Sequence, residues 1–252
     1  MKKEREIIDY LSLAFGIPIV CVIAMRYIPS CKSGVANLIV YGIEGASPSI
    51  AVLLLWWLQQ GREGLYQKLH SRYINGLRIR NCMLGILIPI TILTVAKGAY
   101  LLIHPQQQFL FPITPRKVMI IAWALVAEEL GWRGYLQVEL GRVVSRRWVP
   151  LLVGVIWGAW HFHFFLSGSM EVPIVPFFLG AIFESYGYYA VTEQSDGNIV
   201  PASLWHFTGN LFFNLYRFDP SWHGGNLQAY WIVTAMYAIN LIYFHYSKRT
   251  SS

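Results

Sequence analysis

Residues 118–139 read VMIIAWALVAEELGWRGYLQVE, an apolar stretch long enough to cross a bilayer as a helix but interrupted by charges near its middle. A charge there costs roughly 3 kcal/mol or more, which indicates that the protein uses these residues. Glu129 and Arg133 are four residues apart with the acid first, the favourable arrangement for an ion pair on one helix face. Glu128 lies about 100° further round the helix and lacks that local partner. We therefore expect Glu128 to be the first candidate for chemistry.

The composition of the chain is typical of a membrane protein. Of its 252 residues, 55% are hydrophobic and 13% are charged, and the mean hydropathy is +0.43. These values predict an all-α polytopic bundle rather than a soluble domain. We expect about eight transmembrane helices in a single domain, residues 1–252. The expected spans are residues 7–28, 35–58, 81–103, 118–139, 149–167, 172–193, 199–217 and 226–246.

The distribution of Lys and Arg predicts the orientation. If the N-terminus is inside, thirteen of these residues are cytoplasmic, five lie outside and two lie in the membrane. This bias predicts a multi-pass cell-membrane protein with cytoplasmic N- and C-termini, and it explains the net charge of +7 without a nucleic-acid partner. The thirteen are Lys2, Lys3, Arg5, Arg62, Lys68, Arg72, Arg78, Arg80, Arg142, Arg146, Arg147, Lys248 and Arg249, and the five are Arg26, Lys32, Arg116, Lys117 and Arg217.

Two further spans carry polar side chains at helical spacing. Trp157 and His161 share one face of the fifth span, and His206 and Asn210 share one face of the seventh. From the rise of an α-helix, Glu128, His161 and Asn210 lie roughly 17, 18 and 16 Å from the cytoplasmic end of their spans, and His206 lies roughly 10 Å from it. Buried polar groups need one another as partners, so the common depth predicts one intramembrane site.

These residues are suited to hydrolysis of an amide or ester bond. A buried Glu128 with His161 can activate a water molecule, and His206 with Asn210 can donate hydrogen bonds to an oxyanion. Glu129 and Arg133 would then fix the acid-bearing helix, which makes them supporting residues, together with Trp157. The sequence contains no HExxH motif and no Gly-x-Gly-Asp motif of other intramembrane proteases.

Several alternatives stay open on the residues alone. Single buried polar residues often serve only as hydrogen bonds between helices. A non-catalytic membrane adaptor or immunity protein, and a proton-coupled transporter, would carry similar groups. A zinc-dependent protease using Glu128, His161 and His206 as ligands is the chemical rival of the metal-free reading, which requires no cofactor.

At these positions the chain resembles the CPBP family, the CAAX proteases and bacteriocin-processing enzymes that are also called the Abi family. The family pattern is EExxxR, then [FW]xxxH, then HxxxN or HxxxD, on three hydrophobic helices. The chain matches it in order with Glu128-Glu129…Arg133, Trp157…His161 and His206…Asn210. The flanking stretches GWRGYLQ, IWGAWH and GNIVPASLWHFTGN agree as well, so that the similarity covers most of residues 40–215.

The resemblance implies an intramembrane glutamic endopeptidase whose site opens to the cytoplasmic half of the bilayer. It implies a membrane-associated or lipid-modified, CAAX-like polypeptide as the substrate, with Glu128 and His161 activating water and His206 and Asn210 forming the oxyanion hole. The chain departs from many bacterial members at Phe162-His163-Phe164, where they have Pro shortly after the motif His. We expect His163 to be structural or interfacial, and Glu44 and Glu184 to be helix-packing or cavity groups rather than substrate contacts.

Overall fold

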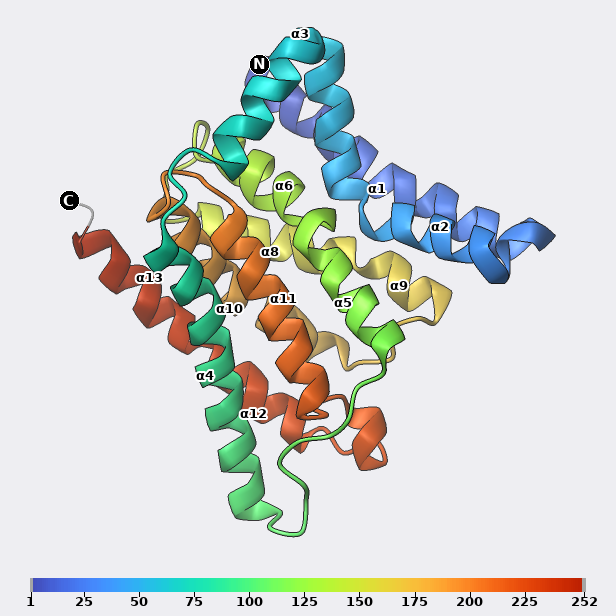
Figure 1. Cartoon of the computed structure of the whole chain (residues 1–252), viewed down its shortest axis with the longest axis vertical. Helices are drawn as coiled ribbons and strands as arrows, with labels where there is room; N and C mark the ends of the chain where they lie inside the picture. The colour runs from blue at the N-terminus through green and yellow to red at the C-terminus, as the bar shows by residue number, and fades with distance from the viewer. Residues whose placement is uncertain (1, 251–252) are drawn as a thin grey trace.

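The computed structural model describes residues 2–250, with side chains for residues 4–246, and every regular element in this range is a helix. The longer helices, several of them bent or broken, follow one another with short connections (Figure 1). In chain order they are α1 (Lys2–Tyr27), α2 (Gly34–Gly45), α3 (Ser47–Tyr73), α4 (Ile79–Ile103), α5 (Pro115–Ala127), α8 (Val149–Trp160), α10 (Ile174–Glu193), α11 (Val200–Leu215), α12 (Gln228–Tyr237) and α13 (Ile239–Thr250).

The predicted all-α membrane bundle is confirmed. Among the described residues, four helical segments are long and apolar enough to cross a membrane, namely Glu4–Tyr27, Ile79–Ile103, Val149–Ser167 and Ile174–Glu193. A fifth span results if α2 and α3, which are bent by 69°, are counted together. The three remaining expected spans form helices that are shorter or broken, so the number eight stays a prediction.

The expected span 35–58 is not one straight helix. Its chain bends between α2 and α3 at Ala46, two residues before Pro48, whose ring removes a backbone donor from the first turn of α3. A second break lies at Gly61, whose φ of 65° is accessible to glycine without a steric cost. Beyond this break the chain continues as a helix to Tyr73.

The span 118–139 is also broken, and the break falls on the acidic pair. Helix α5 ends at Ala127, Glu128 has non-helical φ and ψ of −121° and −41°, and the short helix α6 (Glu129–Gly131) follows. The next turn, η2 (Trp132–Leu136), is a π-helix before α7 (Gln137–Leu140). Wider turns of this kind occur mostly at functional sites. The expectation of one regular helix is therefore wrong at the point where the charges lie.

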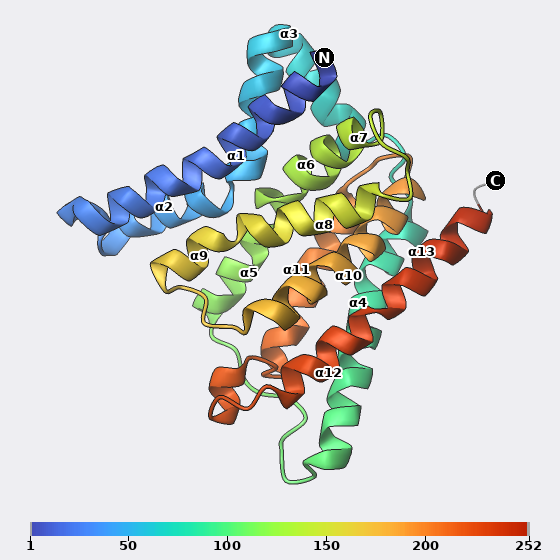
Figure 2. The same ribbon diagram turned by 180° about the vertical axis from the view of Figure 1, so that it is seen from behind.

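The connections gather at two opposite ends of the bundle (Figures 1 and 2). At the end that holds both termini, which we call the terminal face, Ile199 N donates to Arg72 O at 2.9 Å and Arg78 pairs with Asp196 at 2.8 Å. At the other end, the loop face, Phe111 N donates to Leu215 O at 2.9 Å. The loop face consists of residues 28–33, 104–114, 168–173 and 216–227.

Close helix packing around α8 and α10 positions the site. A Cβ atom at Gly154 of α8 would lie 2.8 Å from the backbone of Ile182 on α10, so these two helices approach more closely than any larger residue allows. Small residues at interfaces are the usual means by which membrane helices increase van der Waals contact. The cluster of buried aromatic residues beside them includes Tyr10, Trp132, Trp160 and Trp205.

Candidate active site

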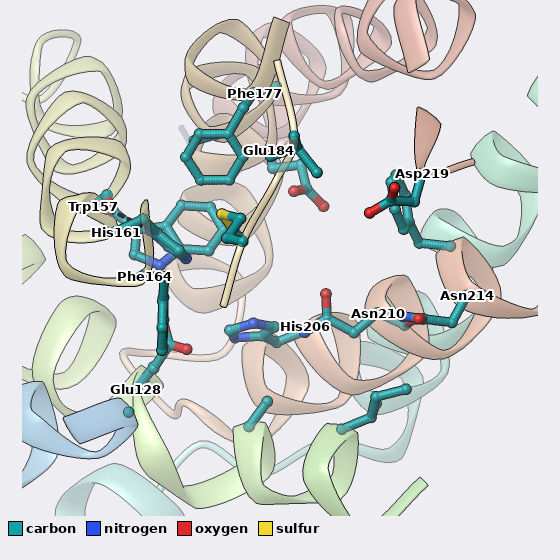
Figure 3. Close-up of a pocket in the computed structure, with 18 of the residues that line it drawn as sticks. Glu128, Trp157, His161, Phe164, Phe177, Glu184, His206, Asn210, Asn214 and Asp219 are labelled. Atoms are coloured by element: carbon teal, nitrogen blue, oxygen red, sulfur yellow. Dashed lines mark hydrogen bonds between the residues drawn. The ribbon is translucent and has the colours of Figure 1, made fainter. Parts of the chain in front are cut away.

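A cavity of about 350 Å³ lies between the halves of the bundle. Side chains from α5, α8, α10, α11 and α12 line it, and they include Glu128, Trp157, His161, His206 and Asn210 (Figure 3). The residues come from three segments far apart in the sequence. The structure therefore brings together the polar groups that the sequence places at one depth.

Glu128 is 9% exposed, and it lies where α5 ends. Its Oε2 accepts a hydrogen bond of 2.8 Å from Nε1 of Trp157, the residue one turn before His161 on α8. Among the described residues Glu128 has no ion-pair partner, but this hydrogen bond holds its carboxylate, which differs from the expectation of an unpaired carboxylate. The single indole donor leaves the rest of the carboxylate facing the cavity (Figure 3).

His161 follows the last residue of α8 and is 7% exposed. Its Nδ1 lies 2.8 Å from the backbone oxygen of Trp157. Because a carbonyl oxygen only accepts, Nδ1 must carry the hydrogen. The neutral ring then has an unprotonated Nε2, which is the form that a general base requires.

Trp157 is the centre of the arrangement. Its ring centroid lies 5.5 Å from that of His161 and 5.8 Å from that of His206, both nearly perpendicular to it. The Arg133 guanidinium carbon lies 4.8 Å from the same ring. Trp157 thus orients the carboxylate through its N–H, one imidazole through its carbonyl and the second through ring contact, a larger role than sequence reasoning gave it.

Glu129 and Arg133 form the expected ion pair, and both side chains are completely buried behind the cavity wall. The Arg133 Nη1 atom lies 3.1 Å from Glu129 Oε1. The rest of the guanidinium lies over the ring of Tyr188, with its carbon 4.0 Å from the centroid. Tyr188 is a residue that the sequence analysis missed. Its one signal is the spacing of four from Glu184, which places both on one face of α10.

His206 belongs to the same buried network. Its Nδ1 lies 2.8 Å from Glu129 Oε1, and the carboxylate acts as the acceptor. The other ring nitrogen, Nε2, is the one left to serve the cavity. If it is to donate to an oxyanion as expected, His206 must be doubly protonated, and its positive charge would offset one of the two neighbouring carboxylates.

Asn210 lies one turn after His206 on α11, and both face the cavity (Figure 3). Its side chain is half-buried, and among the described residues no other side chain holds its amide by a hydrogen bond. The amide is therefore free to turn toward a bound group. Asn214, one turn further along, is fixed instead by donation to the backbone oxygen of Asn210.

The other acidic residues in the spans have two different environments. Glu44 at the end of α2 accepts from Nδ1 of His163 at 2.6 Å, and both side chains are fully buried. This pair joins α2 to α9 (Phe162–Ser167), which is the structural role expected of His163. Glu184 lines the cavity itself, opposite Glu128 (Figure 3).

Fully buried side chains pack on the terminal-face side of the cavity. Four residues lie one residue or about one helical turn closer to the terminal face than the polar residues of the site. They are Trp132, Arg133, Tyr188 and Trp205, and each is at most 1% exposed. We call these four residues the aromatic floor. On the opposite side, the lining continues to residues of the loop face.

No three His, Cys, Asp or Glu side chains within the described part of the chain have a geometry that could hold a metal ion. Two ring nitrogens of the expected zinc ligands are also engaged, His161 Nδ1 by a carbonyl and His206 Nδ1 by Glu129. Metal dependence is therefore a matter for direct measurement.

A helical membrane bundle that holds an acid, two imidazoles and an amide around one buried cavity has the arrangement of an intramembrane hydrolase. Residues 111–212 match the family described as type II CAAX prenyl endopeptidase Rce1-like. This stretch contains all three motifs, and the match supports the resemblance to the CPBP family of CAAX proteases. No curated protein matches the chain.

Proposed function

We propose that the protein is an intramembrane endopeptidase that hydrolyses a peptide bond of a membrane-associated or lipid-modified, CAAX-like polypeptide with a water molecule activated by Glu128 and His161, without a metal. The observation that carries this proposal is that Trp157 makes a hydrogen bond with each of these two residues. The Trp157 side chain holds the Glu128 carboxylate, and the Trp157 carbonyl holds the His161 ring in the base-competent tautomer. The membrane protease family of the site-bearing segment supports it.

In this mechanism, a water molecule between Glu128 and His161 gives up a proton and attacks the carbonyl carbon of the peptide bond. The carbonyl oxygen becomes an oxyanion as the C–O bond to water forms. Collapse of this intermediate breaks the C–N bond, and the proton taken from water passes to the leaving amine. Water is divided between the two products, so the reaction needs no other reactant.

The oxyanion would be stabilised from α11. His206 Nε2 and the Asn210 amide are neighbours on one face of that helix and line the same cavity. Donors held in place before the reaction cost no reorganisation when the charge develops. Glu129 and Arg133 fix the His206 ring from behind. Because His206, Glu129 and Arg133 are buried, these interactions are stronger than in water.

The proposal is tested with purified protein and an internally quenched, farnesylated peptide that ends in a CAAX sequence. Glu128→Gln and His161→Gln should each abolish cleavage and leave thermal unfolding in detergent near that of the wild type. Glu193→Gln is a matched control, because Glu193 ends α10 at the terminal face. If either active-site variant keeps full activity, the mechanism is wrong.

A wild-type protein that does not cleave this peptide still requires a search for its natural substrate. Membrane peptides of cells that produce the wild type or Glu128→Gln can be compared by mass spectrometry. The protease assignment predicts peptides that are present only with the wild type. Identical peptide profiles would instead favour the non-catalytic adaptor.

A further inference from the structure

A second cavity, of about 600 Å³, lies near the loop face and outside the proposed mechanism. It is a groove between α1 and α2 on one side and α5 and α9 on the other. Figures 1 and 2 show α1 and α2 lying side by side along this part of the bundle. Tyr41 and Ile120 line both this groove and the active-site cavity, so the two cavities are adjacent.

The rim of the groove toward the loop face is positively charged. Arg26 is the second-last residue of α1 and Arg116 is the second residue of α5, so both lie at the loop-face ends of their helices. Both side chains are exposed, and within residues 4–246 neither forms a salt bridge with a carboxylate. The described lining residues include no acid, but they include the hydroxyl groups of Ser167 and Ser169. The rim therefore has the chemistry of an anion site.

The rest of the lining is largely apolar. Val22 and Ile120 each lie one helical turn, roughly 6 Å, inward from the arginine of the same helix. Leu38 of α2 and Leu166 of α9 add to this surface. Leu38, Ile120 and Leu166 are 51%, 39% and 69% exposed, so the surface is open to the hydrocarbon of a bilayer. The groove thus changes from basic to apolar over about one turn of helix.

We propose that this groove binds one anionic phospholipid, with its phosphate at Arg26 and Arg116 and an acyl chain against the apolar lining. The planar guanidinium group is suited to phosphate because its N–H donors match two oxygen atoms at once. Basic pockets between transmembrane helices bind the headgroups of anionic lipids. A free phosphate ion would use the rim alone, and an uncharged chain would use the apolar part alone. An anionic phospholipid matches both.

A lipid in this position would hold together helices that are far apart in the sequence. Beside the groove, Trp123 Nε1 on α5 donates to Gly42 O on α2 at 3.1 Å, one turn of α5 inward from Ile120. A ligand that contacts α1, α2, α5 and α9 at once and binds only the folded bundle stabilises it. This effect does not depend on catalysis, so the proposal can be tested apart from the proposed function.

The test is thermal unfolding of the full-length protein in a non-ionic detergent, with one added compound at a time. Dioleoyl phosphatidylglycerol should raise the unfolding temperature in a saturable way. Arg26→Gln and Arg116→Gln should each raise the concentration needed for half of this effect about fivefold, and the double variant about 30-fold, as expected for one and two cations at a lipid headgroup. Both arginines are exposed, so the variants should unfold like the wild type when no lipid is added.

Arg147→Gln is the matched control, because it removes the same charge from the terminal face. The Arg147 side chain is exposed and lies over the ring of the next residue, Trp148, at 5.6 Å, as Arg26 lies over Tyr27 at 5.9 Å. This variant should respond to phosphatidylglycerol like the wild type. An equal loss of response in Arg147→Gln and Arg26→Gln would show attraction by net charge alone and would overturn the proposal.

Three further additives separate the sources of the ligand. Dioleoyl phosphatidylcholine, farnesol and inorganic phosphate should each stabilise the protein less than phosphatidylglycerol does. An equal effect of phosphatidylcholine or farnesol would assign the groove to an apolar chain, and an equal effect of phosphate would assign the rim to a free anion; both results contradict an anionic phospholipid. Phosphatidylglycerol with a photoreactive acyl chain should crosslink to peptides that contain Leu38 or Leu166, and crosslinks only elsewhere would refute this location.

Discussion

The Trp157→Phe variant removes the indole N–H that donates to Glu128 Oε2 at 2.8 Å. It keeps an aromatic ring against His161, His206 and Arg133, whose contacts with Trp157 involve the ring and not the N–H. The backbone carbonyl that holds His161 is also unchanged. We expect this variant to lose activity through the orientation of a single carboxylate.

A hydrogen bond to a charged group contributes about 1.5–3 kcal/mol, and each 1.4 kcal/mol changes a rate about tenfold. Complete loss of this hydrogen bond would therefore lower kcat/KM roughly 10- to 150-fold. Glu128 faces the cavity, where water can replace the lost donor. We therefore expect a decrease at the lower end of this range, in kcat rather than in KM, with little change in stability.

Trp160→Phe is the matched control, one turn of α8 away. Trp160 is also fully buried, but its N–H donates to Ala14 O and Ser47 Oγ at 3.1 and 3.0 Å, and its ring contact with His161, at a centroid distance of 5.0 Å, is kept by Phe. This variant should unfold at a lower temperature and yet cleave the quenched peptide at nearly the wild-type rate per folded molecule. The two variants thus separate lost orientation from lost stability.

Wild-type turnover by Trp157→Phe would refute the idea that this hydrogen bond orients the catalytic acid. An equal loss of activity in both tryptophan variants would refute it as well, because the effect would then follow from general damage to α8.

Glu129→Ala and Arg133→Ala should each lower stability by about 3–5 kcal/mol, because each leaves an uncompensated buried charge, and unfolding like the wild type in detergent would show that the pair is solvated. Glu44→Ala should also lower the unfolding temperature by leaving His163 buried without its partner, but turnover per folded molecule should stay near wild type, and an inactive folded protein would place this pair in the site. Exhaustive chelation should leave cleavage unchanged in protein free of zinc, whereas activity lost with one bound zinc and restored by adding zinc would assign a metal mechanism.

The composition and the helical rise are sufficient to predict the helical bundle and the shared depth of Glu128, His161 and Asn210. Both depend on repeating geometry, and small errors in the ends of helices do not change them. The Glu129–Arg133 pair was predictable for the same reason, since it lies within one turn.

Contacts between distant residues could not be predicted in this way. The hydrogen bond from Trp157 to Glu128 joins residues 29 positions apart, and the Glu44–His163 pair joins residues 119 apart. The short helix α6 after the break at Glu128 packs closely on α3, because a Cβ at Gly131 would lie 2.5 Å from Pro48. No pattern within residues 118–139 predicts that Pro48 lies against them.

The aromatic floor has a consequence for the membrane as a whole. An enzyme that uses water inside a bilayer risks making a path for protons, which would discharge the gradient that the cell maintains. Trp132, Tyr188 and Trp205 place rings between the cavity and the terminal face, and the Arg133 guanidinium, which is paired with Glu129, lies against the ring of Tyr188. We therefore expect water that reaches Glu128 in the cavity to be kept from the terminal face by these packed rings.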